Sequence, residues 1–163
     1  MTNIQLKKAD VNQREAVKTF HIPNHLNISV SNETERKIQT DDLETDFPQL
    51  YDDKLFSEGI TWILIDVNDN SIKGCVSIFP TKNSSIGYLN NFSVDENIRG
   101  KGFGNLLFET ALEFAEKNYK TIQLITLPNR MKTALKVYKK NDFVLIEEMK
   151  EGPYVVWKME KAF

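Results

Sequence analysis

The segment IGYLNNFSVDENIRGKGFGN, residues 86–105, decides how the rest of the chain can fold. Its first nine residues include Ile, Tyr, Phe and Val, which favour a strand over 86–94. Apolar side chains recur at helical spacing after the segment, which predicts an amphipathic helix over about 103–118. A further apolar run predicts a strand over 121–127. Strand, glycine-rich turn, helix and strand in this order form a crossover, which implies that the two strands are parallel.

Shorter elements on both sides of this crossover complete the predicted sheet. Alternating and β-branched patterns predict strands over 4–9, 60–67 and 72–80, and a hairpin with strands over 143–148 and 154–160 around Glu151-Gly152-Pro153. Helical patterns cover 11–20 and 31–56, with an interruption at Phe47-Pro48, and a last helix contains Met131, Ala134, Leu135 and Tyr138. The predicted fold class is α/β: a mixed, mostly antiparallel sheet with one parallel β-α-β crossover and helices on both faces.

Composition limits what kind of protein this can be. The chain has 163 residues, the size of one domain, and 21 basic against 23 acidic residues give a net charge of −2. That balance argues against a nucleic-acid-binding protein. No apolar run is long enough for a membrane span, and the N-terminus has no apolar secretory segment, so we expect a cytoplasmic protein.

Metal binding is not expected from this sequence. Cys75 is the single cysteine, so it can form neither an internal disulfide nor a cysteine zinc site, and we expect it to be a small buried residue. His21 and His25 are four residues apart, but Pro23 between them should break a helix. We therefore predict that both histidines lie in a loop or at the surface, and that no metal site exists.

The alternating glycines are suited to holding a phosphate. Glycine lets backbone N–H groups approach a ligand closely, and a helix N-terminus adds unpaired donors. The spacing fits neither a P-loop nor the dinucleotide fingerprint G-x-G-x-x-G. It does fit R-x-x-G-x-G, with Arg99, Gly102 and Gly104. This motif resembles the acetyl-CoA pyrophosphate loop of the GNAT superfamily of N-acetyltransferases.

The strand before the loop supports the resemblance. Leu89, Phe92 and Val94 stand where the family strand carries apolar residues, and the step of three residues from Leu89 to Phe92 breaks strand alternation. A β-bulge explains the step, whereas a turn at Asn90-Asn91 between two short strands is the alternative. The bulge is preferred because the segment then leads into the glycine loop at the expected distance.

A second family element reads N-x-x-A-x-x-x-Y-x-x-x-G-F, and Ala134, Tyr138 and Phe143 match it. Met131 replaces the Asn, and Asp142 replaces the Gly in a place where Asp tolerates a left-handed helix end. By resemblance Tyr138 is the general acid that protonates the departing thiolate. From its spacing alone it would be a core residue. No carboxylate lies on the strand 86–94, so the general base is not identified.

The resemblance implies one GNAT-like domain over 1–163, a three-layer sandwich, with a variable substrate side over 1–59 and an acetyl-CoA-binding core over 60–163. Two neighbouring strands would splay to admit the pantetheine arm, and a backbone N–H near Val94 would polarise the thioester carbonyl. The implied cofactor-binding residues are Phe92, Ser93, Val94, Arg99, Gly100, Lys101, Gly102, Phe103, Gly104 and Asn105.

The resulting hypothesis is an acetyl-CoA-dependent N-acetyltransferase that acts on a primary amine of a small molecule or peptide, without a metal. The alternative is a non-catalytic CoA-binding or regulatory domain, and a weaker third option is an NAD-binding oxidoreductase. Residues 31–60 hold nine acidic and three basic residues, which indicates a solvated face or a lip that attracts a cationic substrate. The acceptor amine, the length of the acyl chain and a homodimer are left open.

Overall fold

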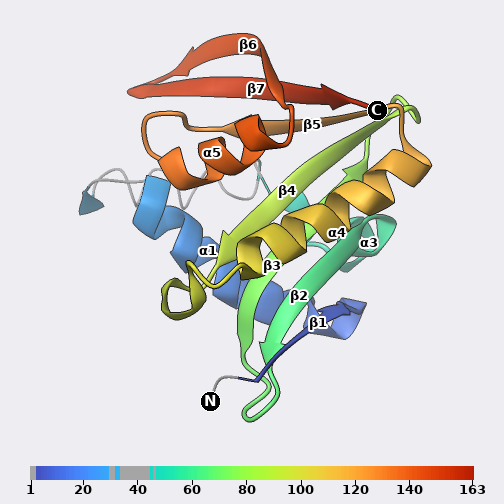
Figure 1. Ribbon diagram of the computed structural model, residues 1–163, viewed down its shortest axis with the longest axis vertical. Coiled ribbons are helices and arrows are strands. Elements are labelled where there is room, and N and C mark those ends of the chain that lie inside the picture. The colour runs from blue at the N-terminus through green and yellow to red at the C-terminus, as the bar shows by residue number, and fades with distance from the viewer. Residues whose placement is uncertain (1–2, 30–31, 34–44, 46) are drawn as a thin grey trace.

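A computed structural model describes residues 3–29, 32–33, 45 and 47–163 of the chain. Its centre is a seven-stranded sheet in the order β1-β2-β3-β4-β5-β7-β6 (Figure 1). The strands are β1 (Ile4–Lys8), β2 (Ile60–Asp66), β3 (Ile72–Pro80), β4 (Ile86–Val94), β5 (Thr121–Thr126), β6 (Val144–Glu151) and β7 (Tyr154–Ala162). β4 and β5 pair in parallel, and the other neighbouring strands pair antiparallel. The predicted mixed sheet with one parallel crossover is confirmed.

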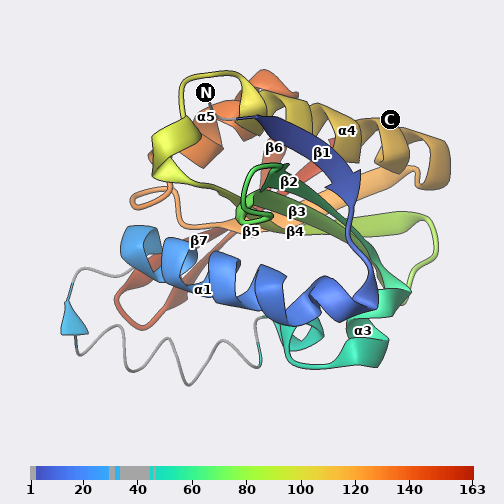
Figure 2. The same cartoon turned by 90° about the horizontal axis from the view of Figure 1, so that it is seen from below.

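Helices cover both faces of this sheet, as expected. Figure 2 shows α4 (Phe103–Asn118) and α5 (Lys132–Lys140) on one face, and α1 (Arg14–Ser29) and α3 (Asp53–Glu58) on the other. Three short 3-10 helices, Val11–Gln13, Pro48–Leu50 and Glu96–Ile98, join these elements. The layers are therefore helix, sheet and helix. No helix in the described part of the chain is both long and apolar enough to cross a membrane.

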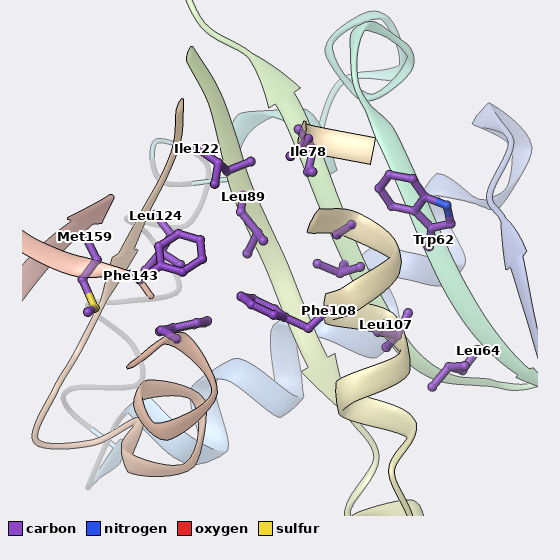
Figure 3. Close-up of a cluster of buried hydrophobic side chains, with 14 of the residues drawn as sticks. Trp62, Leu64, Ile78, Leu89, Leu107, Phe108, Ile122, Leu124, Phe143 and Met159 are labelled. Atoms are coloured by element: carbon purple, nitrogen blue, oxygen red, sulfur yellow. The ribbon is translucent and has the colours of Figure 1, made fainter. Parts of the chain in front are cut away.

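The main hydrophobic core lies between the sheet and α4. Leu107, Phe108 and Ala111 are fully buried on the inner face of this helix. They pack against strand residues that Figure 3 shows pointing into the same space, among them Leu64, Ile78, Leu89, Ile122 and Leu124. Burial of this apolar surface fixes α4 on the sheet and so fixes the glycine loop that precedes it.

The first long helix differs from the prediction. Pro23 lies inside α1, which continues to Ser29, and His21 is only 2% exposed. The expectation that Pro23 ends the helix and leaves both histidines in a loop or at the surface is therefore wrong. The proline lies on the exposed side, and the side-chain Nδ2 of Asn24 donates to the Phe20 carbonyl at 2.7 Å. Packing of the opposite face, with Val17 and Leu26 buried, outweighs the lost backbone hydrogen bond.

The second helical prediction, over 31–56, is tested only in part, because residues 34–44 lie outside the described residues. Within the described part, α3 begins after Asp52, whose carboxylate accepts from the Leu55 N–H at 2.8 Å. This N-cap sets the start of α3, which lies inside the predicted range. Most of the acidic stretch therefore remains a prediction without structural detail.

Candidate active site

The parallel strands β4 and β5 separate in the middle of the sheet. Their pairing covers Ile86–Thr121, Gly87–Ile122 and Tyr88–Gln123 and then ends. Beyond this point β4 continues to Val94, held only by β3, while β5 continues to Thr126, held only by β7. A gap therefore opens between the two strands, which is the splaying that the sequence resemblance implied.

A bulge in β4 stands at the edge of this gap. Cys75 pairs with Ser93 whereas Ser77 pairs with Asn90, so β4 holds one extra residue against β3. Asn91 has a φ of 57°, in the left-handed region that asparagine tolerates. The predicted bulge is confirmed, and it turns the end of β4 toward the glycine loop.

A cavity of about 440 Å³ opens on the sheet face that α4 and α5 cover, and we call it the first cavity. Eight of the implied cofactor-binding residues line it: Phe92, Ser93, Val94, Arg99, Gly100, Gly102, Gly104 and Asn105. Lys101 and Phe103 are not among its lining residues. The cavity is also lined by six residues of α5 and the turn before it: Arg130, Met131, Lys132, Thr133, Ala134 and Val137. Met131 and Ala134 belong to the second family element, whereas the sequence did not identify the other four as site residues.

The glycine loop has the geometry of an anion site. Gly100 and Gly102 have φ values of 73° and 88°, and a Cβ at either position would meet no atom within 4 Å. The first hydrogen bond of α4 runs from the Leu106 N–H to the Gly102 carbonyl at 3.0 Å. The N–H groups of 103–105 thus lie at the open N-terminal end of a sixteen-residue helix, where an anion is favoured.

Basic side chains surround the same loop. Arg99 donates from Nε to the Val94 carbonyl at 3.0 Å, which holds its guanidinium between strand and loop. Lys101 donates from Nζ to the Asn97 carbonyl at 3.1 Å, outside the cavity lining. Arg130, in the turn before α5, and Lys132, its first residue, also line the cavity. The described lining of this cavity therefore holds three cationic residues and no carboxylate.

A second cavity, of about 300 Å³, lies toward α1 on the other face of the sheet. Its lining comes from α1, from the segment before α3, from β4 and β5, and from the β6–β7 hairpin: His25, Thr45, Phe47, Tyr88, Asn90, Ile125, Thr126, Leu127, Met131, Glu151, Tyr154 and Val156. Met131 lines both cavities, so they meet at the gap between β4 and β5. The Thr126 hydroxyl lies 3.9 Å from the Met131 sulfur at this junction.

Tyr138 lies behind the first cavity rather than on its surface. The side chain is 3% exposed, and its ring centroid lies 5.6 Å from that of Phe108 and 6.3 Å from that of Phe92. Burial raises the pKa of its hydroxyl above the usual value, and nearby Tyr88 raises that pKa further. Tyr88 itself borders the second cavity. The role of Tyr138 as an acid stays a prediction.

Two histidines of α1 pack beneath the bulge. The Nδ1 of buried His21 lies 2.7 Å from the Ser93 hydroxyl. The His25 ring lies 5.7 Å from His21 and 5.2 Å from Phe47, and it borders the second cavity. Burial lowers the pKa of His25 to about 4 and lowers that of His21 well below the ordinary value. Sequence reasoning missed this pair, although Val17, His21 and His25 recur every four residues and so share a helix face.

Comparison with known proteins agrees with this geometry. The sequence pattern of the acetyltransferase (GNAT) family matches residues 28–143. None of the curated proteins compared matches the chain. A GNAT-family acetyltransferase from Streptococcus pneumoniae is similar in structure, with a TM-score of 0.68, 22% sequence identity, and coverage of 99% of this chain and 100% of that one.

Two further solved structures carry more specific names. The PaiA N-acetyltransferase of Thermoplasma acidophilum, solved with coenzyme A, has a TM-score of 0.73, 13% identity and 99% coverage of both chains. The ribosomal-protein-S5-alanine acetyltransferase of Vibrio fischeri has a TM-score of 0.65, 17% identity, and coverage of 99% of this chain and 94% of that one. At these identities the likeness is one of fold.

Proposed function

The chain belongs to the GNAT family of acetyltransferases, and from that premise we propose that it transfers an acetyl group from acetyl-CoA to a primary amine. The observation that carries the proposal is the meeting of two cavities at the gap between β4 and β5. One cavity has the shape and charge for a phosphorylated donor. The other gives an acceptor access to the same gap from the opposite face.

The residues present fit coenzyme A. Gly100 and Gly102 leave open space beside the free N–H groups at the start of α4, which suits a pyrophosphate. Arg99, Arg130 and Lys132 supply the matching positive charge. Phe92, Val94, Ala134 and Val137 give the remaining wall an apolar surface that suits a pantetheine arm.

Acetyl-CoA, when bound, supplies the acetyl group as an activated thioester. In our proposal the backbone N–H of Val94, at the end of the splayed strand, donates to the carbonyl oxygen and stabilises the negative charge that develops there. Tyr138 would protonate the leaving sulfur, and the proton that the attacking amine gives up would replace the one lost from the Tyr138 hydroxyl. Burial raises the pKa of this hydroxyl, so it is protonated at neutral pH but is a weaker acid than an exposed tyrosine. The second cavity would hold the amine.

A panel of primary amines tests this function. The free thiol released from acetyl-CoA is measured with small amines, polyamines, amino acids and peptides, for the wild-type protein and for Tyr138→Phe. We expect thiol release that requires one class of amine and that falls strongly in the variant. If CoA binds by calorimetry and no amine in the panel is acetylated, the protein is a CoA-binding module. A thermal shift with NAD and none with acetyl-CoA would instead support the oxidoreductase reading.

A further inference from the structure

The two cavities have opposite electrostatic character. The described lining of the first holds Arg99, Arg130 and Lys132 without a carboxylate. The described lining of the second holds the carboxylate of Glu151 without a lysine or arginine. His25 also borders the second cavity, but burial lowers its pKa to about 4 and it is uncharged at neutral pH. The second cavity is therefore suited to a cation.

Aromatic rings reinforce this preference. Phe47, Tyr88 and Tyr154 line the second cavity from three different elements. The faces of aromatic rings attract ammonium and guanidinium groups, and the attraction grows where water is excluded. Tyr154 pairs directly with Glu151 across the β6–β7 hairpin, so a ring and a carboxylate lie side by side at one end of the cavity.

The register between β5 and β7 shows how far Glu151 and Tyr154 lie from the gap between β4 and β5. Trp157 of β7 pairs with Thr126, the last residue of β5, which lies beside Met131 where the cavities meet. Tyr154 precedes Trp157 by three residues, so Tyr154 and its partner Glu151 lie about 10 Å beyond the gap at a strand rise of about 3.3 Å per residue. The carboxylate is too far along the strand to face the reacting nitrogen directly.

We propose that Glu151 is a specificity-determining residue that binds a second cationic group of the acceptor. The substrate is then an amine that carries another ammonium or guanidinium group within about 10 Å of the reacting nitrogen. The inference rests on the proposed function and names the class of its substrate. The reacting amine enters the gap beside Met131, while the second cation lies between the Glu151 carboxylate and the ring of Tyr154.

Matched pairs of small acceptors test this assignment. Linear diaminoalkanes are compared with amino alcohols of equal length, which keep one amine and replace the second cation by a neutral hydroxyl. Glu151→Gln removes the charge, and Glu147→Gln is the control, because Glu147 lies on β6 outside the described cavity lining. We expect kcat/KM to favour the diamines by roughly tenfold, and Glu151→Gln to abolish that preference through KM. Glu147→Gln should behave like the wild type.

The outcomes separate this inference from the proposed function. Equal kcat/KM for diamines and amino alcohols, or a preference that survives in Glu151→Gln, overturns the role of Glu151 while leaving acetyl transfer intact. If no amine is acetylated, the proposed function fails, and calorimetry of a diamine with the protein–CoA complex decides the inference. Binding that is lost in Glu151→Gln supports it, whereas equal or absent binding in both proteins overturns it.

Discussion

His21 of α1 and Ser93 of β4 share a hydrogen bond of 2.7 Å across 72 residues of sequence. The bond connects the helix beneath the sheet to the strand residue that precedes Val94. Ser93→Ala should lower the free energy of unfolding by about 1–3 kcal/mol, because the buried imidazole loses its partner. Urea unfolding measures the change, with Ser57→Ala as the control for an exposed hydroxyl. An equal loss of unfolding free energy in both variants would show that the hydrogen bond between His21 and Ser93 does not stabilise the protein beyond the effect of an exposed hydroxyl.

Stability should fall in mild acid because of the histidines. Both have lowered pKa values in the folded protein, so the unfolded chain binds more protons once the pH drops below about 6.5. The contribution of the two neutral histidines to the free energy of unfolding is therefore fully present above that pH, and it is lost as the pH falls toward 4. His25 alone accounts for about 2 kcal/mol between about pH 7 and about pH 5. Urea midpoints at the two pH values should differ less in His25→Phe, and an unchanged difference would contradict the assignment.

Substitutions in the glycine loop should weaken CoA binding. In Gly104→Val the new side chain would lie against Val94 and Phe92, which line the first cavity. In Gly102→Val it would also strain a backbone with a φ of 88°. We expect the dissociation constant from calorimetry to rise at least about tenfold in both.

A matched control separates strain from a blocked site. Gly152 has a φ of 56° and open space around it, but it lies at the β6–β7 turn. Gly152→Val should therefore share the backbone strain of Gly102→Val and keep the CoA affinity of the wild type. If both loop variants bind CoA as the wild type does, the pyrophosphate lies elsewhere.

Tyr138→Phe should lower kcat without unfolding the protein. The phenylalanine ring keeps the packing against Phe92, Phe108 and Phe143 and loses only the hydroxyl. Loss of a general acid typically costs about 10²–10⁴ in rate. Steady-state kinetics and thermal unfolding are measured together, and an unchanged kcat would return Tyr138 to a purely structural role.

Local sequence patterns predicted the parts of the fold that local physics controls. The strands near 60–66, 72–80 and 86–94 follow from residue type and spacing. The bulge before Phe92 and the left-handed conformation of Asp142, with a φ of 65°, were expected from the family resemblance together with these local preferences. Cys75 is fully buried, which confirms the prediction that it is a small buried residue. These features depend on neighbours within a few residues.

The features that the sequence did not predict depend on contacts between distant segments. Pro23 is tolerated inside α1 because the other side of this helix is buried against the sheet. The residues around Pro23 do not reveal that packing. The second cavity unites residues from His25 to Val156, and only the folded sheet with its helices brings them together. Arg130 and Lys132 join the first cavity because the start of α5 and the turn before it lie on the same face of the sheet as α4, so no motif around the glycines could identify them.

Met131 has a consequence for selectivity, because one flexible thioether forms part of the wall of both cavities. Space that the side chain gives to one occupant is taken from the other. A bulkier acyl group on the donor side would therefore shrink the room for the acceptor, and a shorter residue in this position would relax both at once. Under the proposed function, donor length and acceptor size would therefore be linked through Met131 rather than set by two independent pockets.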